Sequence, residues 1–167
     1  MDLKRTLMKG TIEPTLDALS RLVGYWTTEA THPAARGVIV RGTASIEWLE
    51  GQRFLIVRSR TDHPDFPGAI SIIGFTDADR VDSSAGESAV DGESRLRMHY
   101  YDSRGIFRVY EVSIDLEAWR IWRDAPEFSQ RFTGRFADNG NRIVGSWQLR
   151  RDDAQWHDDL QIVYRRR

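Results

Sequence analysis

The chain has 167 residues, no cysteine, and a formal net charge of −1 from 24 basic and 25 acidic residues. A chain of this length fits one domain and buries a core without covalent cross-links, so we expect a single domain over residues 1–167. The absence of cysteine excludes disulfides and thiolate metal sites. The near-neutral balance gives no general attraction to phosphates, so we expect no nucleic-acid partner.

The first ten residues, MDLKRTLMKG, mix charges with isolated apolar side chains. No apolar stretch of signal-peptide length follows, and none approaches the roughly 18 residues of a membrane span. We therefore expect a cytoplasmic protein with no membrane partner, in which residues 1–12 form an N-terminal tail.

One segment has the periodicity of a helix. Between Pro14 and Val23 the apolar residues recur at helical spacing, and proline is tolerated in a first helical turn because its missing N–H has no partner there. The rest of the chain is typical of strands and turns. Alternation of apolar and polar residues is clearest from Val38 to Leu49. Further strands are predicted at Arg53–Thr61, Ile70–Phe75, Leu96–Tyr101, Ile106–Ile114, Ala118–Arg123, Phe128–Phe136, Arg142–Arg150 and Gln155–Arg165.

Short turn sequences join most of these strands, among them Asp102-Ser-Arg-Gly105 and Asp138-Asn-Gly-Asn141. Strands that follow each other through tight turns favour an up-and-down arrangement, whereas a sandwich needs longer crossovers. The predicted fold is therefore all-β: an antiparallel, lipocalin-like barrel of about 8–10 strands, with one short N-terminal helix closing one end. The longest irregular stretch, residues 76–94, is predicted to be a flexible acidic loop. Its sequence does not match the EF-hand pattern, so no metal is expected there.

The segment from Leu19 to Trp26 resembles the opening of lipocalin-type barrels, in which a short helix precedes a Gly-x-Trp that begins the first strand. Gly24-Tyr25-Trp26 occupies that place. The resemblance implies that the indole plugs the closed end and that a late arginine packs across it. Arg165, in the last predicted strand, is the residue expected to do so.

Over residues 16–164 the chain resembles a family of uncharacterised bacterial lipocalin-like domains of the calycin type. The motifs that carry this resemblance are Glu47-Trp48-Leu49, Tyr101–Tyr110, Gly145-Ser-Trp147 and Trp156. A more distant likeness is to nitrobindin, a haem-binding barrel whose axial histidine lies on a late strand and points inward. His157 is the histidine in a comparable place. This likeness implies haem binding as an alternative; otherwise no cofactor or metal is expected.

The 18 aromatic residues, six of them tryptophan, are enough to line or to fill a barrel interior. The side chains predicted to line a ligand pocket are Trp26, Trp48, Trp122, Phe132 and Trp147. The polar groups predicted to orient a ligand are Arg58, His99, Arg108, Tyr110 and Gln130, since an inward polar side chain needs a partner. Two plainer interpretations stay open: the aromatic rings fill the interior, and the arginines lie along the outer wall.

The leading functional hypothesis is a carrier or sensor of a small hydrophobic molecule. Neither a Gly-x-Ser-x-Gly elbow nor a phosphate loop occurs, His32-Pro33 and His63-Pro64 are typical of turns, and no catalytic residue is assigned. An enzyme of isomerase, cyclase or hydrolase type, using buried Tyr, His or Arg in the same cavity, is the alternative. An outer wall bearing Trp and Ile would also suit a homodimer.

Overall fold

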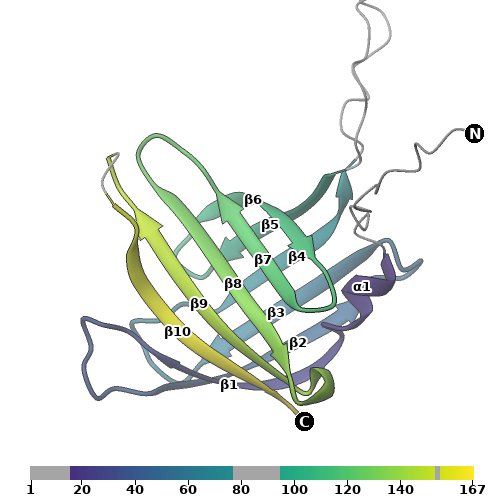
Figure 1. Ribbon diagram of the computed structural model, residues 1–167, viewed down its shortest axis with the longest axis horizontal. Coiled ribbons are helices and arrows are strands. Elements are labelled where there is room, and N and C mark those ends of the chain that lie inside the picture. Colours follow the sequence, from purple (N-terminus) through teal and green to yellow (C-terminus); the bar gives the residue numbers. More distant parts are fainter. Residues whose placement is uncertain (1–15, 77–94, 153–154) are drawn as a thin grey trace, which may run out of the picture.

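The computed structural model describes residues 16–76, 95–152 and 155–167, which form a closed barrel of ten antiparallel strands (Figure 1). Each strand pairs with its neighbours in sequence, and β10 pairs with β1 to close the barrel. The predicted antiparallel up-and-down barrel is confirmed. The predicted tail at residues 1–12 and nearly all of the predicted acidic loop lie outside the described residues.

Short turns set this topology, because each one returns the chain beside the strand it has just left. The elements in order are α1 (Leu16–Ser20), β1 (Gly24–Thr31), β2 (Val40–Trp48), β3 (Phe54–Thr61), β4 (Ala69–Thr76), β5 (Arg95–Asp102), β6 (Phe107–Ile114), β7 (Ala118–Arg123), β8 (Ser129–Ala137), the 3₁₀ turn η1 (Asp138–Gly140), β9 (Arg142–Arg150) and β10 (His157–Arg166). Within the described ranges, no helix has the length and apolar character needed to span a bilayer.

The described helix α1 is short and ends three residues before the predicted end at Val23. The N–H groups of Leu22 and Val23 donate to the carbonyls of Leu19 and Ser20, so the last turn tightens to three-residue spacing. Gly24, with φ of +141°, then turns the chain into β1. A residue with a side chain rarely adopts that backbone conformation.

Alternation along the strands divides the barrel into an inner and an outer face. In β2, Val40, Ala44 and Ile46 are buried, whereas Arg41 and Glu47 are exposed, as the sequence pattern predicts. The inward side chains of the ten strands together make one core, which continues onto α1 through Leu19 and onto the α1–β1 connection through Leu22. These two leucines have no exposed surface, so α1 acts as the plug of one barrel end.

Trp26 and Arg166 complete this closed end. The Trp26 indole N–H donates to the carbonyl of Leu22 at 2.9 Å, and the Arg166 guanidinium lies 4.2 Å from the centre of the indole ring. The prediction that Arg165 packs across Trp26 is therefore wrong by one residue. Alternation along β10 sends Arg165 outward, where it pairs with Glu29 at 2.9 Å, and sends Arg166 inward.

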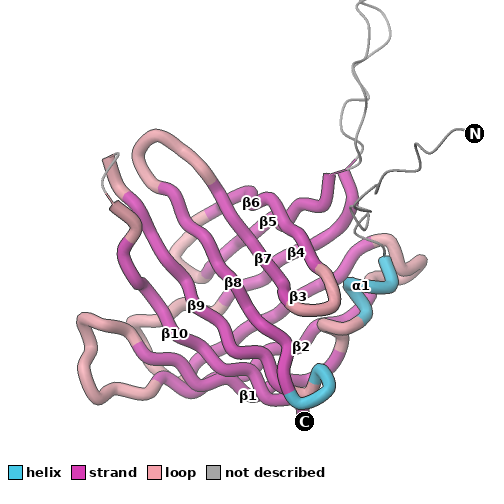
Figure 2. The backbone as a smooth tube through the Cα atoms, in the orientation of Figure 1, coloured by secondary structure: helices cyan, strands magenta, loops and turns pink. Residues whose placement is uncertain are grey.

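The loops that follow β1, β3, β5, β7 and β9 all lie at the barrel end opposite α1, as an up-and-down order requires (Figure 2). That end has no helix across it in the described residues. Among the described residues, the interior is therefore plugged at the α1 end and open at the opposite end.

Candidate functional site

A cavity of about 590 Å³ lies inside the barrel and opens at the end opposite α1. We refer to it as the barrel cavity. Its volume lies within the range of small-molecule binding sites. Its apolar wall includes Ile46, Met98, Trp119, Ile121, Trp147 and Ile162, contributed by five different strands. The interior is thus only partly filled by its aromatic residues.

Four of the ten predicted site residues line the barrel cavity: Arg108, Tyr110, Gln130 and Trp147. They come from β6, β8 and β9, and their rings and polar groups meet. The Tyr110 and Trp147 ring centres are 6.1 Å apart in an edge-to-face arrangement. Alternation along β6 places Arg108 and Tyr110 on the same inner face as Val112 and Ile114.

Three other predicted residues, Trp26, Trp48 and Phe132, belong to the core but not to the cavity wall. Trp26 and Phe132 are each 1% exposed. Phe132 lies against Gly134 and Gly145, which face each other across β8 and β9, and a methyl group added at either glycine would collide with its ring. These aromatic side chains fill the interior, as the plainer interpretation held.

The remaining three, Arg58, His99 and Trp122, lie on strand positions that face away from the cavity. Arg58 and Trp122 are exposed, and His99 packs edge-to-face against the exposed Phe107. Other residues of the same three strands line the cavity instead. They are Val57 and Ser59 of β3, Tyr100 of β5, and Trp119 and Ile121 of β7. For β5 the signal was in the sequence, since Tyr100 shares a face with Leu96 and Met98. For β7 both faces carry a tryptophan and an arginine, so alternation could not decide.

The histidines occupy the rim or the outside of the barrel. His157 is exposed at the start of β10 and does not line the cavity, so a haem held within the cavity would be out of its reach. His32 and His63 begin the turns predicted for them and line the cavity mouth. The His32 ring accepts the Ala34 N–H at Nδ1 and donates from Nε2 to Asp159 at 3.2 Å, a pairing that the neutral ring supports.

A polar cluster of Arg108, Tyr110 and Gln130 interrupts the apolar wall. The Gln130 Oε1 accepts the Tyr110 hydroxyl at 2.7 Å and the Arg108 Nη1 at 3.0 Å. Burial raises the pKa of Tyr110, and the Arg108 and Arg123 guanidinium groups oppose this rise. The phenol therefore stays protonated at neutral pH and acts as a hydrogen-bond donor.

Trp119 presents an unsatisfied donor at the cavity wall. The residue is 4% exposed, lines the barrel cavity, and its indole N–H has no acceptor among the described residues. A buried N–H without an acceptor costs about 1–3 kcal/mol.

A second group, Tyr100, Asp102 and Arg104, lies where β5 turns into β6 and was not predicted. The Asp102 side chain is fully buried and accepts the Tyr100 hydroxyl at 3.1 Å and the Arg104 Nη2 at 2.7 Å. Burial of Asp102 would raise its pKa, but hydrogen bonds from Arg104, Ile106 and Tyr100 outweigh it and lower the pKa to about 2. Burial and the same carboxylate raise the pKa of Tyr100.

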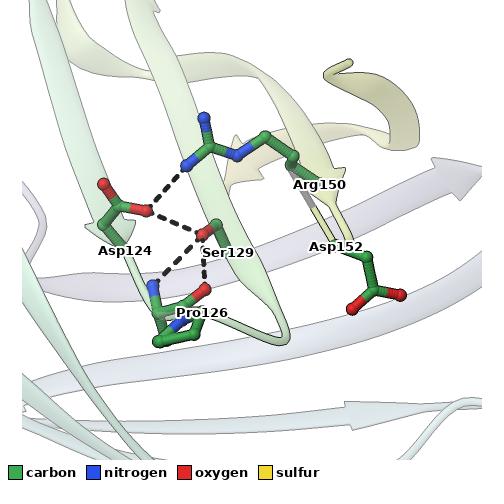
Figure 3. Close-up of a pocket in the computed structure, with 6 residues that line it drawn as sticks. Asp124, Pro126, Ser129, Arg150 and Asp152 are labelled. Carbon is green, nitrogen blue, oxygen red and sulfur yellow. Dashed lines mark hydrogen bonds and ion pairs between the residues drawn. The ribbon is translucent and has the colours of Figure 1, made fainter. Parts of the chain in front are cut away.

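A second hollow of about 450 Å³ lies outside the barrel cavity, beside the β7–β8 loop (Figure 3). The Ser129 hydroxyl accepts the Ala125 N–H at 3.1 Å and lies 2.8 Å from Asp124, which also binds Arg150 at 2.8 Å. These groups satisfy one another and fix the loop. In the part of the chain that the structure describes, no three His, Asp or Glu side chains converge to hold a metal ion.

Comparison with protein-family models finds no match, and comparison with curated proteins finds no significant match. Among solved structures, the crystal structure of Rv2717c from M. tuberculosis is similar to this chain, with a TM-score of 0.60 and 17% sequence identity. The similarity covers 91% of this chain and 96% of that chain. At this identity the similarity shows a shared barrel fold and nothing about activity.

Proposed function

We propose that the chain binds a small, largely apolar molecule inside the barrel, as a carrier or sensor of the lipocalin-like kind. The observation that carries the proposal is the barrel cavity itself, a space of about 590 Å³ with tryptophan, isoleucine and methionine on its wall. Burial of apolar surface supplies roughly 25 cal/mol per Å² removed from water, offset by the lost freedom of the ligand.

The contacts favour binding over an isomerase, cyclase or hydrolase in the same cavity. Acid–base catalysis needs a base with a pKa near the working pH. The cavity phenols, Tyr100 and Tyr110, have raised pKa values and stay protonated. The two histidines on the wall, His32 and His63, lie at the mouth and begin turns.

The proposal is tested with 1-aminoanthracene, a neutral apolar dye whose emission rises when it leaves water. We expect saturable binding to the native chain and at least a tenfold loss in the variant Ala44→Phe, because Ala44 is 2% exposed and lines the cavity. Thr43→Phe is the matched control, since Thr43 is the neighbouring residue and faces outward. Equal binding by both folded variants, or no binding by the native chain, would refute the proposal.

A further inference from the structure

We propose that the ligand of the barrel cavity is an amphiphile with an anionic oxygen headgroup, which Arg108 binds. This inference rests on the proposed binding function and adds the chemical class of the ligand. It starts from the charges on the cavity wall, which carries three arginines, Arg60, Arg104 and Arg108.

These three guanidinium groups have different environments. Arg60 is exposed, and Arg104 is neutralised by Asp102. Arg108 is half-buried, and its partners among the described residues are the Gln130 amide oxygen at 3.0 Å, the Tyr110 hydroxyl and the Phe128 ring at 4.6 Å. All three partners are neutral. A partly desolvated charge without a counter-ion is unfavourable, so an anion beside Arg108 would be stabilised.

The carboxylates on the wall of the barrel cavity have partners other than Arg108. On the wall, Asp159 is bound by His32 at 3.2 Å, and Asp65 lies in the mouth near His63. Within the described residues, no carboxylate oxygen lies within salt-bridge distance of Arg108. Arg123 is the second arginine whose charge opposes the rise in the pKa of Tyr110. Its guanidinium donates to the neutral backbone carbonyl of Phe128 at 2.8 Å. Two guanidinium groups, those of Arg108 and Arg123, therefore act on Tyr110 against one carboxylate, that of Asp102, which Arg104 already binds.

The free hydrogen-bonding groups of the wall are also donors. Gln130 uses its oxygen for both Tyr110 and Arg108, which leaves its NH₂ group to donate, and no protein acceptor for it is found in the described ranges. Trp119, a cavity residue that is 4% exposed, carries a further N–H without an acceptor among the described residues, although the indole nitrogen itself is buried. A headgroup rich in acceptors fits this wall, whereas a headgroup of donors would leave these groups unpaired.

The experiment compares ligands that differ only in their headgroup. Alkyl carboxylates and alkyl sulfates from eight to sixteen carbons compete with 1-aminoanthracene at pH 8, each beside the alcohol of equal length. We expect at least one anionic series to bind ten times more tightly than its alcohols. The preference should fall to about one in Arg108→Gln and remain in Arg58→Gln, because Arg58 faces outward and is exposed.

The outcomes separate this inference from the proposed function. If the dye binds but alcohols compete as well as both anionic series, the headgroup assignment is overturned and apolar binding stands. If the preference survives in folded Arg108→Gln, the anion is bound by another group and the assignment to Arg108 is wrong. If neither the dye nor any amphiphile binds, the proposed function itself fails.

Discussion

The Arg166 guanidinium lies 4.2 Å from the centre of the Trp26 indole ring and connects β10 with two other segments of the chain. It donates to the carbonyls of Val23, Arg21 and Gly140, which belong to the α1–β1 connection and the β8–β9 turn. Burial lowers its pKa, but an arginine remains charged at every ordinary pH. One cation therefore joins the last strand, the helix end and a distant turn around the plug of the barrel.

Removal of this cation should cost far more stability than removal of its neighbour. We expect Arg166→Ala to lower the free energy of unfolding by about 2–4 kcal/mol, since charged hydrogen bonds and a cation–π contact are lost together. Arg165→Ala is the matched control, because Arg165 makes an exposed pair with Glu29 worth about 0–1 kcal/mol. Urea denaturation measures both. Equal losses would show that the closed end does not depend on Arg166.

Gly24 is expected to be irreplaceable for two reasons at once. Its φ of +141° is unfavourable for residues with a side chain, and a methyl group there would collide with the Arg166 guanidinium. Gly24→Ala should cost about 2–4 kcal/mol of unfolding free energy. Gly51→Ala, at φ of +85° with nothing within 4 Å of the added carbon, should cost about 1 kcal/mol. Thermal and urea unfolding compare the two, and similar costs would argue against the collision.

Phe132 and Gly145 should be energetically coupled. A methyl group at Gly145 would meet the Phe132 ring, which is 1% exposed and has little room to move. We expect Gly145→Ala to cost about 1–3 kcal/mol in the native background and clearly less in Phe132→Leu, where the ring is absent. A double-mutant cycle by urea denaturation measures the coupling. Additive costs would mean that the strand backbone, and not the Phe132 ring, is the reason for glycine at position 145.

The low pKa of Asp102 predicts a dependence of stability on acid. Its pKa of about 2 in the folded state lies below the ordinary aspartate pKa of 3.8, so its stabilising effect is complete above pH 3.8 and is lost as the pH falls towards 2. Asp102→Asn should therefore lower the free energy of unfolding at pH 7 by about 1–3 kcal/mol. The deficit should shrink between pH 4 and pH 2. Asp65→Asn, at an exposed carboxylate of the mouth, serves as control; a deficit independent of pH would contradict the assignment.

The two candidate tyrosine positions show where prediction of the site succeeded and failed. Tyr110 shares a face with Val112 and Ile114, and the structure places it on the cavity wall. Tyr100 shares a face with Leu96 and Met98 and also lines the cavity, yet its neighbour His99 was the residue predicted. The apolar neighbours of a position were the better guide, because burial of one strand face is decided by all its residues together.

The sequence alone determined the fold class, the strand order and most strand boundaries to within one residue, because alternation and turn chemistry are local properties of neighbouring residues. Only the tertiary structure decided that Arg166 and not Arg165 covers Trp26, and which aromatic side chains fill the interior. It also brought Arg108 and Gln130 within 3.0 Å across 22 residues of sequence. These outcomes depend on how the barrel closes and on the register in which its strands pair. Both are properties of all ten strands together, so no short segment of the sequence reveals them.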